Sequence, residues 1–337
     1  MESTQLRLAR RPVAEPDETT FETTTATLPA LEDGQVLLAV RYLSLDPYMR
    51  GRLSTAKSYA APVEIGQVMV GGTVGEVVES RYDGLQPGDL VLSYSGWQSA
   101  DVVDGAAVRR LDPDAGPPST ALGVLGMPGF TAYAGLLEIG RPQPGETVAV
   151  AAATGPVGSA VGQIARIKGA RAIGIAGGPA KVRALTEDFG FDVALDHRAP
   201  DFAEQLARAT PDGVDVYFEN VGGHVFEAML PQLNKHARIP VCGLVAGYNA
   251  SSAPAGPDRL PGFMAAVLTR SLVVRGFIQD EFTHSHGRDF VRDMGEWVRS
   301  GQVRYREDVV DGLENAPAAF AGMLRGTNFG KLVVRVS

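Results

Sequence analysis

The stretch from Glu146 to Gly178 decides the fold of the chain, and it reads E-T-V-A-V-A-A-A-T-G-P-V-G-S-A-V-G-Q-I-A-R-I-K-G-A-R-A-I-G-I-A-G-G. Residues 147–151 are an apolar run without polar alternation, which is typical of a strand buried on both faces of a parallel sheet. The turn at 153–158 reads A-T-G-P-V-G, a dinucleotide-binding fingerprint with Ala in place of the first Gly. Gly155 would let the backbone approach a pyrophosphate, and Gly158 would let the next helix pack on the strand.

The residues after this turn have the period of an amphipathic helix. Four apolar side chains recur at helical spacing, at Val157, Val161, Ile164 and Ile167. Gly169 follows where a left-handed residue would end the helix, and residues 171–175 form a second apolar run. The stretch therefore predicts a strand–helix–strand unit whose helix begins with its anion-binding end at the turn.

The end of the second predicted strand indicates which dinucleotide binds. An NAD site usually places Asp or Glu there, about 20 residues after the turn, to accept hydrogen bonds from the ribose 2′-hydroxyl. Here residues 176–178 read A-G-G, and Lys181 and Arg183 follow within one helical turn. Because no carboxylate would repel a 2′-phosphate and two cations would attract it, the sequence favours NADP(H). The alternative is that Lys181 is a solvated helix charge and that the glycines form only a turn.

Composition narrows the class of protein. The 337 residues are 45% apolar and 21% charged with a net charge of −8, which suits two globular domains and gives no reason to expect nucleic acid or membrane as partner. Cys242 is the single cysteine, so no disulfide framework exists and we expect a reducing compartment. The N-terminus lacks an apolar segment of secretory length, and no apolar run of about 18 residues occurs, so we expect a cytoplasmic protein.

Three regions follow one another along the chain. Residues 1–125 read as short strands between Gly, Pro and Asp turns, which predicts a mostly-β, barrel-like domain. Residues 126–300 alternate strand and helix patterns, which predicts a doubly wound α/β nucleotide-binding domain. Residues 301–337 end in the strand pattern 331–336, which we expect to return to the first domain. Residues 252–262 are rich in Pro, Gly and Ala and are expected to form a surface loop.

Further blocks of sequence extend the pattern over nearly the whole chain. They are S-L-D-P-Y-M-R at 44–50, S-G-W-Q at 95–98, G-M-P-G-F-T-A-Y at 126–133, Y-F-E-N-V-G-G at 217–223, C-G-L at 242–244 with Y-N at 248–249, and N-F-G-K at 328–331. In this order they closely resemble the medium-chain dehydrogenase/reductases. Within them the chain looks like the zinc-independent, NADPH-dependent double-bond reductases of the prostaglandin reductase and bacterial curcumin reductase type. The resemblance implies an α/β Rossmann domain with a doubly wound parallel sheet, a mostly-β GroES-like domain, an NADP(H) cofactor and a homodimer.

The fingerprint and the resemblance together give a candidate cofactor-binding set. It comprises Met127, Thr131, Thr154, Gly155, Pro156, Val157, Gly158, Gly177, Lys181, His197, Asn220, Cys242, Gly243, Phe277, Ile278 and Asn328. The resemblance places His197 near the adenosine 2′-phosphate beside Lys181. It places Asn220 and Asn328 at cofactor contacts, the latter only if the C-terminal strand folds back.

The same resemblance raises the question of zinc, because other members of the superfamily oxidise alcohols on that metal. Those members need a catalytic set of Cys, His and carboxylate and usually a structural site of four cysteines. Here Cys242 stands alone, and the five histidines all lie in the second half of the chain, at positions 197, 224, 236, 284 and 286. Neither set can be assembled, so no metal is expected.

Without a metal, hydride delivery suits a carbon–carbon double bond conjugated to a carbonyl group. Hydride attack on the β-carbon builds negative charge on the carbonyl oxygen, and the protein must place a hydrogen-bond donor there. Tyr248 is the candidate, because it follows a predicted strand end and the resemblance implies a tyrosine near the substrate carbonyl. The alternative is a loop tyrosine with its hydroxyl in water. Ala246 and Gly247 stand where relatives often carry hydroxyl residues, so the proton for the α-carbon would come from solvent.

Other aromatic and histidine residues are secondary candidates. Tyr48 and Tyr59 are candidates for the substrate pocket, where packing or gating is favoured over acid catalysis. His224 and His236 lie in stretches with a helical pattern and are interpreted as surface or cap residues.

The leading hypothesis is an NADPH-dependent reductase of α,β-unsaturated ketones and aldehydes, with a small hydrophobic enone as substrate. The alternatives are a quinone reductase of the same superfamily and a non-catalytic NADPH-binding redox sensor, since fold does not imply activity. Apolar residues between 252 and 270 suggest either a hydrophobic entrance or a dimer contact, and they are Leu260, Phe263, Met264 and Val267. The physiological substrate is left open.

Overall fold

The computed structural model describes residues 1–252 and 256–337. These residues form two compact units. The β unit comprises Met1–Gly123 and Glu307–Ser337, and the α/β unit comprises Val124–Arg306. Each unit is described by itself below.

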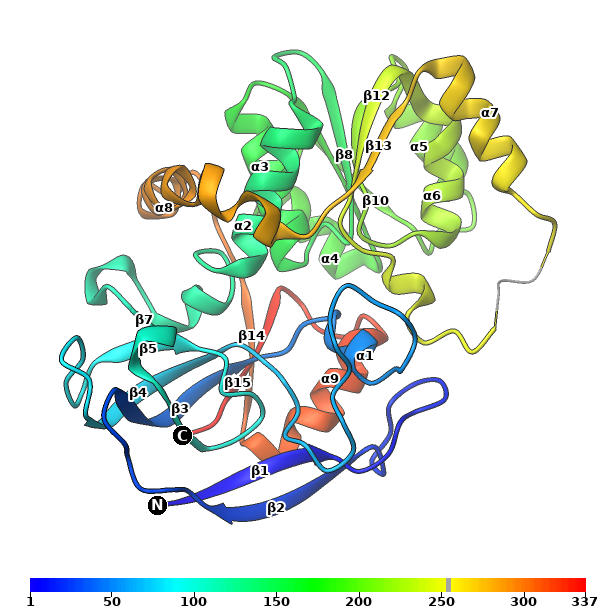
Figure 1. Cartoon of the computed structure of the whole chain (residues 1–337). Coiled ribbons are helices and arrows are strands. Elements are labelled where there is room, and N and C mark those ends of the chain that lie inside the picture. Colours follow the sequence, from blue (N-terminus) through cyan, green and yellow to red (C-terminus); the bar gives the residue numbers. More distant parts are fainter. Residues whose placement is uncertain (253–255) are drawn as a thin grey trace. The chain divides into compact units, whose positions relative to one another are not determined.

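The described residues of the α/β unit build a six-stranded sheet in the order β10-β9-β8-β11-β12-β13, with every pair parallel (Figure 1). Its strands are β8 (Thr147–Ala151), β9 (Arg171–Ala176), β10 (Val193–Asp196), β11 (Val214–Phe218), β12 (Leu233–Val241) and β13 (Val273–Gly276). The strand order reverses between β8 and β11. Open α/β sheets bind ligands outside the carboxyl ends of their strands at such a point.

Helices cover both faces of this sheet. They are α2 (Met127–Ala134), the π-helical turn η4 (Gly135–Gly140), α3 (Pro156–Ile167), α4 (Pro179–Glu187), α5 (Phe202–Ala209), α6 (Gly223–Met229), α7 (Leu260–Arg270) and α8 (Thr283–Arg299). Figure 1 shows α2 and α3 on one side of the sheet and α5, α6 and α7 on the other. On that second side, Ile173 and Ile175 of β9 join Tyr217 of β11, Leu206 of α5 and Met229 of α6 in one buried cluster.

The β unit has an antiparallel pair and a larger sheet. The pair is β1 (Glu2–Leu8) with β2 (Phe21–Thr27). The larger sheet runs β14-β15-β3-β4-β5-β7, and β6 also pairs with β3. These strands are β3 (Gln35–Ser44), β4 (Thr73–Ser80), β5 (Leu90–Ser93), β6 (Ala100–Asp104), β7 (Arg109–Arg110), β14 (Glu307–Asp311) and β15 (Lys331–Arg335). Two helices accompany them, α1 (Met49–Arg52) and α9 (Ala316–Leu324). The last strand β15 is antiparallel to β3, with Val333 opposite Ser44.

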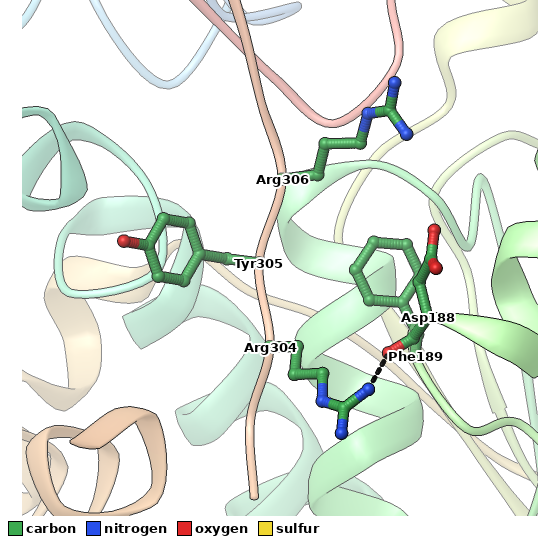
Figure 2. Close-up of a pocket in the computed structure, with 5 residues that line it drawn as sticks. All are labelled: Asp188, Phe189, Arg304, Tyr305 and Arg306. Atoms are coloured by element: carbon green, nitrogen blue, oxygen red, sulfur yellow. Dashed lines mark hydrogen bonds between the residues drawn. The ribbon is translucent and has the colours of Figure 1, made fainter. Parts of the chain in front are cut away.

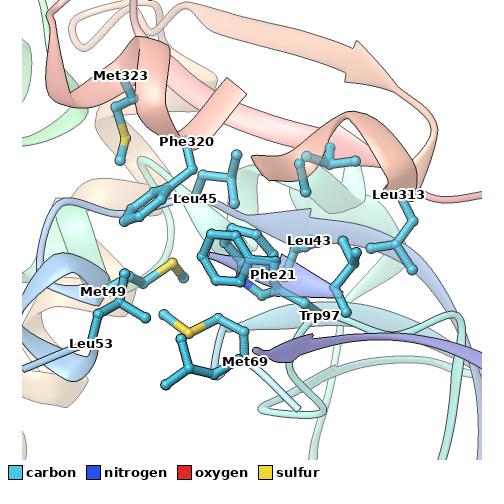
Figure 3. Close-up of a cluster of buried hydrophobic side chains, with 14 of the residues drawn as sticks. Phe21, Leu43, Leu45, Met49, Leu53, Met69, Trp97, Leu313, Phe320 and Met323 are labelled. Carbon is cyan, nitrogen blue, oxygen red and sulfur yellow. The ribbon is translucent and has the colours of Figure 1, made fainter. Parts of the chain in front are cut away.

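The core of the β unit gathers around Trp97 (Figure 3). Phe21 of β2 stacks on the Trp97 ring with centroids 5.0 Å apart, and Phe320 of α9 meets it edge-on at 5.7 Å. Such offset and edge-on pairs add about 0.5–1.5 kcal/mol each to the area they bury. Residues far apart in the sequence are thereby held in one cluster with Leu43 and Met69.

A buried ion pair ties β15 to the segment that follows β3. The Lys331 ammonium lies 2.9 Å from Asp46 Oδ1 and donates to the Leu45 carbonyl at 2.7 Å. Ser44 Oγ donates to the other oxygen of the Asp46 carboxylate. The Lys331 and Asp46 side chains are only 3% and 7% exposed. Each charge is therefore matched by its partner inside the unit.

The fold class expected from the sequence is confirmed: a doubly wound parallel sheet accompanies a mostly-β domain. Two local expectations need correction. His236 lies in strand β12 with a φ of +67°, not in a helical stretch. The loop expected over 252–262 is confirmed at residues 252 and 256–259, but residues 260–262 already belong to helix α7, which begins with Pro261 in its first turn. Residues 253–255 of that expected loop lie outside the described residues.

Helix α7 also divides the apolar residues that were expected to act together at an entrance. Phe263 packs edge-on against Phe226 of α6 with centroids 5.7 Å apart, and Val267 packs on the buried cluster of the sheet. Leu260 and Met264 share that face of the helix, since the four residues have i, i+3, i+4, i+7 spacing, but they are exposed. Two of the four residues are therefore partly buried packing residues, and the other two are accessible.

Candidate nucleotide and substrate site

The turn between β8 and α3 has the geometry that a dinucleotide needs. Gly155 is the N-cap of α3 and has no side chain, and Pro156 takes the first helical position. Within the part of the chain that the structure describes, no side chain caps this helix start. A Cβ atom on Gly155 would meet only the Ala152 carbonyl, at 3.2 Å, so the backbone is open to a phosphate. Ala152 itself adopts a φ of +50°, which completes the tight turn without a glycine.

Gly158 serves the packing of α3 on the sheet. A Cβ atom there would lie 2.5 Å from the Ala152 carbonyl oxygen and 2.7 Å from Ala153 Cα. Both are backbone atoms, so neither has room to move aside. Thr154, which precedes Gly155, is buried.

The carboxyl ends of β9 and β10 bring basic groups around Gly177. Asp196 Oδ1 accepts from the Gly178 N–H at 3.0 Å and from the Arg198 N–H at 2.9 Å, which joins the two strand ends. Burial opposes ionisation of Asp196, but these bonds prevail and lower its pKa. A Cβ atom on Gly177 would lie 2.7 Å from Arg198 Nε and 2.8 Å from His197 Nε2.

The pKa of His197 is lowered, first by burial and then by the positive charges of its neighbours. Those neighbours are His224, Arg198 and Lys181, while Asp196 acts in the opposite direction. The environment is electropositive, which is what a 2′-phosphate requires. His224, interpreted from the sequence as a surface or cap residue, is exposed in the first turn of α6, and it also faces His197 at 3.2 Å between ring nitrogens.

The ends of β11 and β12 are joined through Glu219 and Asn220. Asn220 Nδ2 donates to the Ala151 carbonyl at the end of β8, at 2.9 Å. Glu219 Oε1 accepts from the Val221 and Gly222 N–H groups at 2.6 and 2.8 Å. Glu219 is 1% exposed, and burial raises its pKa. Among the described residues, neither Glu219 Oε2 nor the buried Tyr217 hydroxyl makes a hydrogen bond of good geometry.

Cys242 and Gly243 follow β12. Their N–H groups donate to the Glu219 carbonyl at 2.9 and 3.1 Å, which aligns this strand end with that of β11. Burial, followed by the charge of Glu219, raises the pKa of the Cys242 thiol to about 12. The thiol is therefore neutral at physiological pH and a weak nucleophile.

Tyr248 ends the short turn η6 (Val245–Gly247) after β12. Its hydroxyl accepts a long bond of 3.5 Å from the Leu244 N–H, and a Cβ atom on Gly243 would lie 3.4 Å from it. The hydroxyl is thus turned back over the carboxyl end of the sheet. Because all these strands are parallel, Tyr248 and the nucleotide residues lie along one edge.

Four further candidates lie at α2 and after β13. Thr131 Oγ1 donates to the Met127 carbonyl at 2.8 Å, so both residues belong to the first turns of α2. Phe277 is buried and meets Phe218 of β11 edge-on at 6.2 Å, whereas Ile278 next to it is exposed. Phe277 thus has a packing role of its own, independent of any ligand.

Three candidates belong to the β unit. Tyr48 immediately precedes α1, and Tyr59 is 60% exposed. The Arg52 guanidinium lies 5.5 Å from the Tyr48 ring centre and 4.9 Å from that of Tyr59. Burial, then the Asp46 charge, raises the pKa of Tyr48, so its hydroxyl is a donor and not a base. Asn328 Nδ2 donates to the Gly330 carbonyl at 2.9 Å, which shapes the turn into β15.

Sequence reasoning missed that Arg198, His224 and Glu219 help to build the site at the carboxyl ends of the parallel strands. The motif Y-F-E-N-V-G-G contains Glu219, but nothing in its spacing shows that the carboxyl group is buried. Arg198 directly follows His197, so a second cation beside that candidate was a usable signal. His224 has no local signal, since its contact spans 27 positions.

A separate hollow of about 380 Å³ lies in the α/β unit and is lined by Asp188, Phe189, Arg304, Tyr305 and Arg306 (Figure 2). Arg304 Nη1 donates to the Asp188 carbonyl at 3.5 Å, and Figure 2 shows that bond across it. The hollow contains none of the residues expected to bind cofactor or substrate.

Two properties of the described residues bear on other classes of function. They contain no group of three or more His, Cys, Asp or Glu side chains placed to hold a metal ion. Every helix described is too short or too polar to cross a bilayer.

Comparison with known proteins gives consistent matches. Residues 4–111 match the N-terminal domain of oxidoreductases, and residues 156–285 match the model described as zinc-binding dehydrogenase. The chain is 56% identical to the NADPH-dependent curcumin reductase of Escherichia coli over 330 residues, 98% of this chain and 96% of the relative. It is 41% identical to prostaglandin reductase 1 of Bos taurus, with 96% of each chain covered. The crystal structure of CurA in complex with NADPH from Vibrio vulnificus superposes with a TM-score of 0.96, 52% identity and 99% coverage of both chains.

Proposed function

Because the chain belongs to the medium-chain dehydrogenase/reductases, and within them to the NADPH-dependent double-bond reductases, we propose that it reduces the C=C bond of α,β-unsaturated ketones and aldehydes with NADPH. The observation that carries this proposal is the combination of an uncapped glycine turn after β8 with a basic tip of β9, whose residues 176–178 carry no carboxylate of their own. When bound, NADPH supplies a hydride from the nicotinamide ring.

The chain's own residues would hold the two ends of the cofactor. The start of α3 would accept the pyrophosphate, since the first N–H groups of an α-helix have no partner within it and no side chain caps this start among the described residues. Gly155 would contribute close approach rather than a donor, because its N–H donates to the Ala152 carbonyl at 2.9 Å. Lys181 and His197 attract the 2′-phosphate. Asn220 and Gly243, at the ends of β11 and β12, and Met127, Thr131, Phe277, Ile278 and Asn328 remain proposed contacts on the resemblance.

Tyr248 would stabilise the charge that develops on the substrate carbonyl. Its hydroxyl already lies over the carboxyl edge of the sheet, near Gly243 and Leu244. A donor placed before the reaction costs no reorganisation as the enolate oxygen forms. The α-carbon would take its proton from solvent, because Ala246 and Gly247 carry no titratable group. Tyr48 and Tyr59 are proposed to contact the substrate.

The reaction is proposed to be independent of zinc. The donor set is the reason: the chain has a single cysteine, Cys242, which is half-buried and whose thiol pKa is raised to about 12, so a Cys, His and carboxylate set with several thiolates cannot be assembled. A quinone reductase is the second candidate function. The blocks around residues 44–50 match the enone reductases and favour the first.

A homodimer and a cytoplasmic location complete the proposal. The sheet of the α/β unit ends in β13, whose residues are all exposed, and Val273 and Val274 present apolar side chains there. Met264 and Leu268 of α7 are exposed as well. Unpaired apolar edge strands favour pairing with another chain. The single cysteine supports a reducing compartment.

The direct test is NADPH oxidation with a panel of acceptors: a linear enone, an alkenal, curcumin and a quinone, each repeated with NADH. We expect NADPH-dependent turnover of the enone and the alkenal. Tyr248→Phe should lower kcat/KM by about tenfold, since one hydrogen bond to a developing charge is lost. Tyr82→Phe, a half-buried tyrosine packed in the β unit, is the matched control and should leave the rate unchanged.

The outcomes separate the candidates. Turnover of the quinone alone would replace enone reduction by quinone reduction. Tight NADPH binding without turnover of any acceptor would leave a binding protein and refute the proposal.

A further inference from the structure

Two histidines from different elements meet beside the tip of β9. His197 follows β10, and His224 lies in the first turn of α6. His197 Nδ1 lies 3.2 Å from His224 Nε2, and the same His224 nitrogen lies 3.2 Å from the His197 carbonyl oxygen. Phe202 of α5 packs edge-on against the His224 ring with centroids 6.4 Å apart. The pair is therefore held by three elements of the unit.

This geometry selects one tautomer for each ring. A backbone carbonyl only accepts, so His224 must carry its proton on Nε2 to bond to the His197 oxygen. The same N–H then faces His197 Nδ1, which accepts. The neutral His197 ring consequently carries its own proton on Nε2.

That Nε2 atom and Arg198 Nε converge at Gly177. They would lie 2.8 and 2.7 Å from a single Cβ atom built there, so one phosphate group beside the glycine can accept from both. Asp196 fixes the backbone on both sides, through the N–H groups of Arg198 and Gly178. Lys181 of α4 adds a third cationic group.

His197 already belongs to the proposed 2′-phosphate site; we propose that His224 is the positioning residue that presents His197 to this phosphate, and that Arg198 binds it beside His197. The inference rests on the proposed use of NADPH. It makes this histidine pair, and not the charge of Lys181 alone, the determinant of NADPH over NADH.

The histidine pair also makes the preference for NADPH over NADH depend on pH. In the free protein His197 is kept neutral by burial and by His224, Arg198 and Lys181, against the attraction of Asp196. A bound 2′-phosphate brings negative charge, which raises the pKa of His197 and favours proton uptake. Protonated His197 donates from Nδ1, and His224 accommodates this by taking its other tautomer and accepting at Nε2. Affinity for a 2′-phosphate should thus rise as pH falls from about 8.5 towards 6.5.

The test uses adenosine fragments, which need no hydride transfer. The full-length protein is titrated calorimetrically with 2′,5′-ADP and with 5′-AMP at pH 6.5 and pH 8.5. We expect 2′,5′-ADP to bind at least about tenfold more tightly than 5′-AMP, with the larger ratio at pH 6.5. His224→Leu should lower 2′,5′-ADP affinity by about tenfold, abolish its proton uptake and leave 5′-AMP binding unchanged.

Two further variants separate positioning from loss of charge or of fold. In His224→Gln the side-chain amide can donate to or accept from His197 Nδ1, so binding and its pH dependence should largely return. Lys235→Ala removes an exposed charge from β12 and should have no effect. The inference would be overturned if His224→Leu kept the wild-type preference for 2′,5′-ADP over 5′-AMP with the wild-type pH dependence. Equal binding of the two fragments by the wild type would also overturn it. Discrimination without turnover of any enone would refute the proposed reaction and leave the inference standing.

Discussion

Asp46 in the β unit and Glu219 in the α/β unit are both buried carboxyl groups, but they differ in their partners. Asp46 meets the Lys331 ammonium at 2.9 Å. Glu219 has no cation among the partners described; two backbone N–H groups hold one oxygen, and the other makes no hydrogen bond of good geometry, although the Tyr217 hydroxyl lies near the carboxyl group. The buried charge is balanced at Asp46, in the interior of the β unit. It is left unbalanced at Glu219, at the carboxyl ends of the parallel strands, where the cofactor is proposed to bind.

Glycines show the same difference. At the carboxyl edge of the sheet, Gly158 and Gly177 are pressed against backbone or basic side chains. By contrast, Gly295 in α8 has nothing within 4 Å of a Cβ atom. A methyl group would therefore clash at Gly158 and Gly177 but not at Gly295. Three substitutions test these two contrasts, in charge and in packing, and they follow in order of expected effect.

The largest effect is expected from breaking the balanced pair. Lys331→Met leaves the Asp46 charge buried without a partner, which should lower the free energy of unfolding by about 3–5 kcal/mol. Urea denaturation measures it. Arg41→Met is the matched control, because its pair with Glu76 is about one-third exposed and contributes at most about 1 kcal/mol. Equal losses in the two variants would mean that the buried pair is not special.

An intermediate effect is expected at the nucleotide turn. Gly158→Ala forces a methyl group against the Ala152 carbonyl, which should cost about 1–3 kcal/mol of stability and weaken NADPH binding at least about tenfold. Thermal unfolding and fluorescence titration with NADPH measure the two effects. Gly295→Ala, in the interior of α8, should be neutral or stabilising by up to about 1 kcal/mol. If NADPH binding by Gly158→Ala matched that of the wild type, the turn would not be the pyrophosphate site.

The smallest effect is expected at the unbalanced carboxyl group. The pKa of Glu219 is raised in the folded state, chiefly by burial. The folded chain therefore binds the proton more tightly than the unfolded chain, and this group's contribution to stability falls as pH rises from the unfolded pKa through the folded one. Glu219→Gln removes that loss and keeps an oxygen for the Val221 and Gly222 N–H groups, so stability at pH 8 should rise by about 1 kcal/mol.

The matched control is Glu204→Gln on the exposed side of α5, which should not change the pH profile. A Glu219→Gln variant that loses stability equally at all pH values would show that the carboxylate itself is needed, and the comparison with Asp46 would fail.

Local patterns predicted much of the fold. The strand, turn and helix of the fingerprint appear as β8, Gly155 and α3, because period and glycine position are properties of neighbouring residues. The pattern did not predict His236 in β12 or helix α7, where the tertiary setting overrides weak local preferences.

Only the part of the site that is built from residues close together in the sequence could be predicted. The A-G-G tip and Lys181 could be found because their meaning depends on a fixed spacing from the turn. The His197–His224 contact and the Lys331–Asp46 pair join residues 27 and 285 positions apart, and no local pattern encodes them. The candidate roles of Tyr248, Tyr48, Tyr59 and Asn328 stay predictions.

The most direct test of the proposed reaction is the position of the transferred hydrogen. NADPH carrying deuterium at the reactive position of the nicotinamide C4 is incubated with the protein and a linear enone, and the product is analysed by NMR. The account predicts one deuterium on the former β-carbon and an intact carbonyl group. Deuterium on the carbonyl carbon, in an alcohol product, would contradict it.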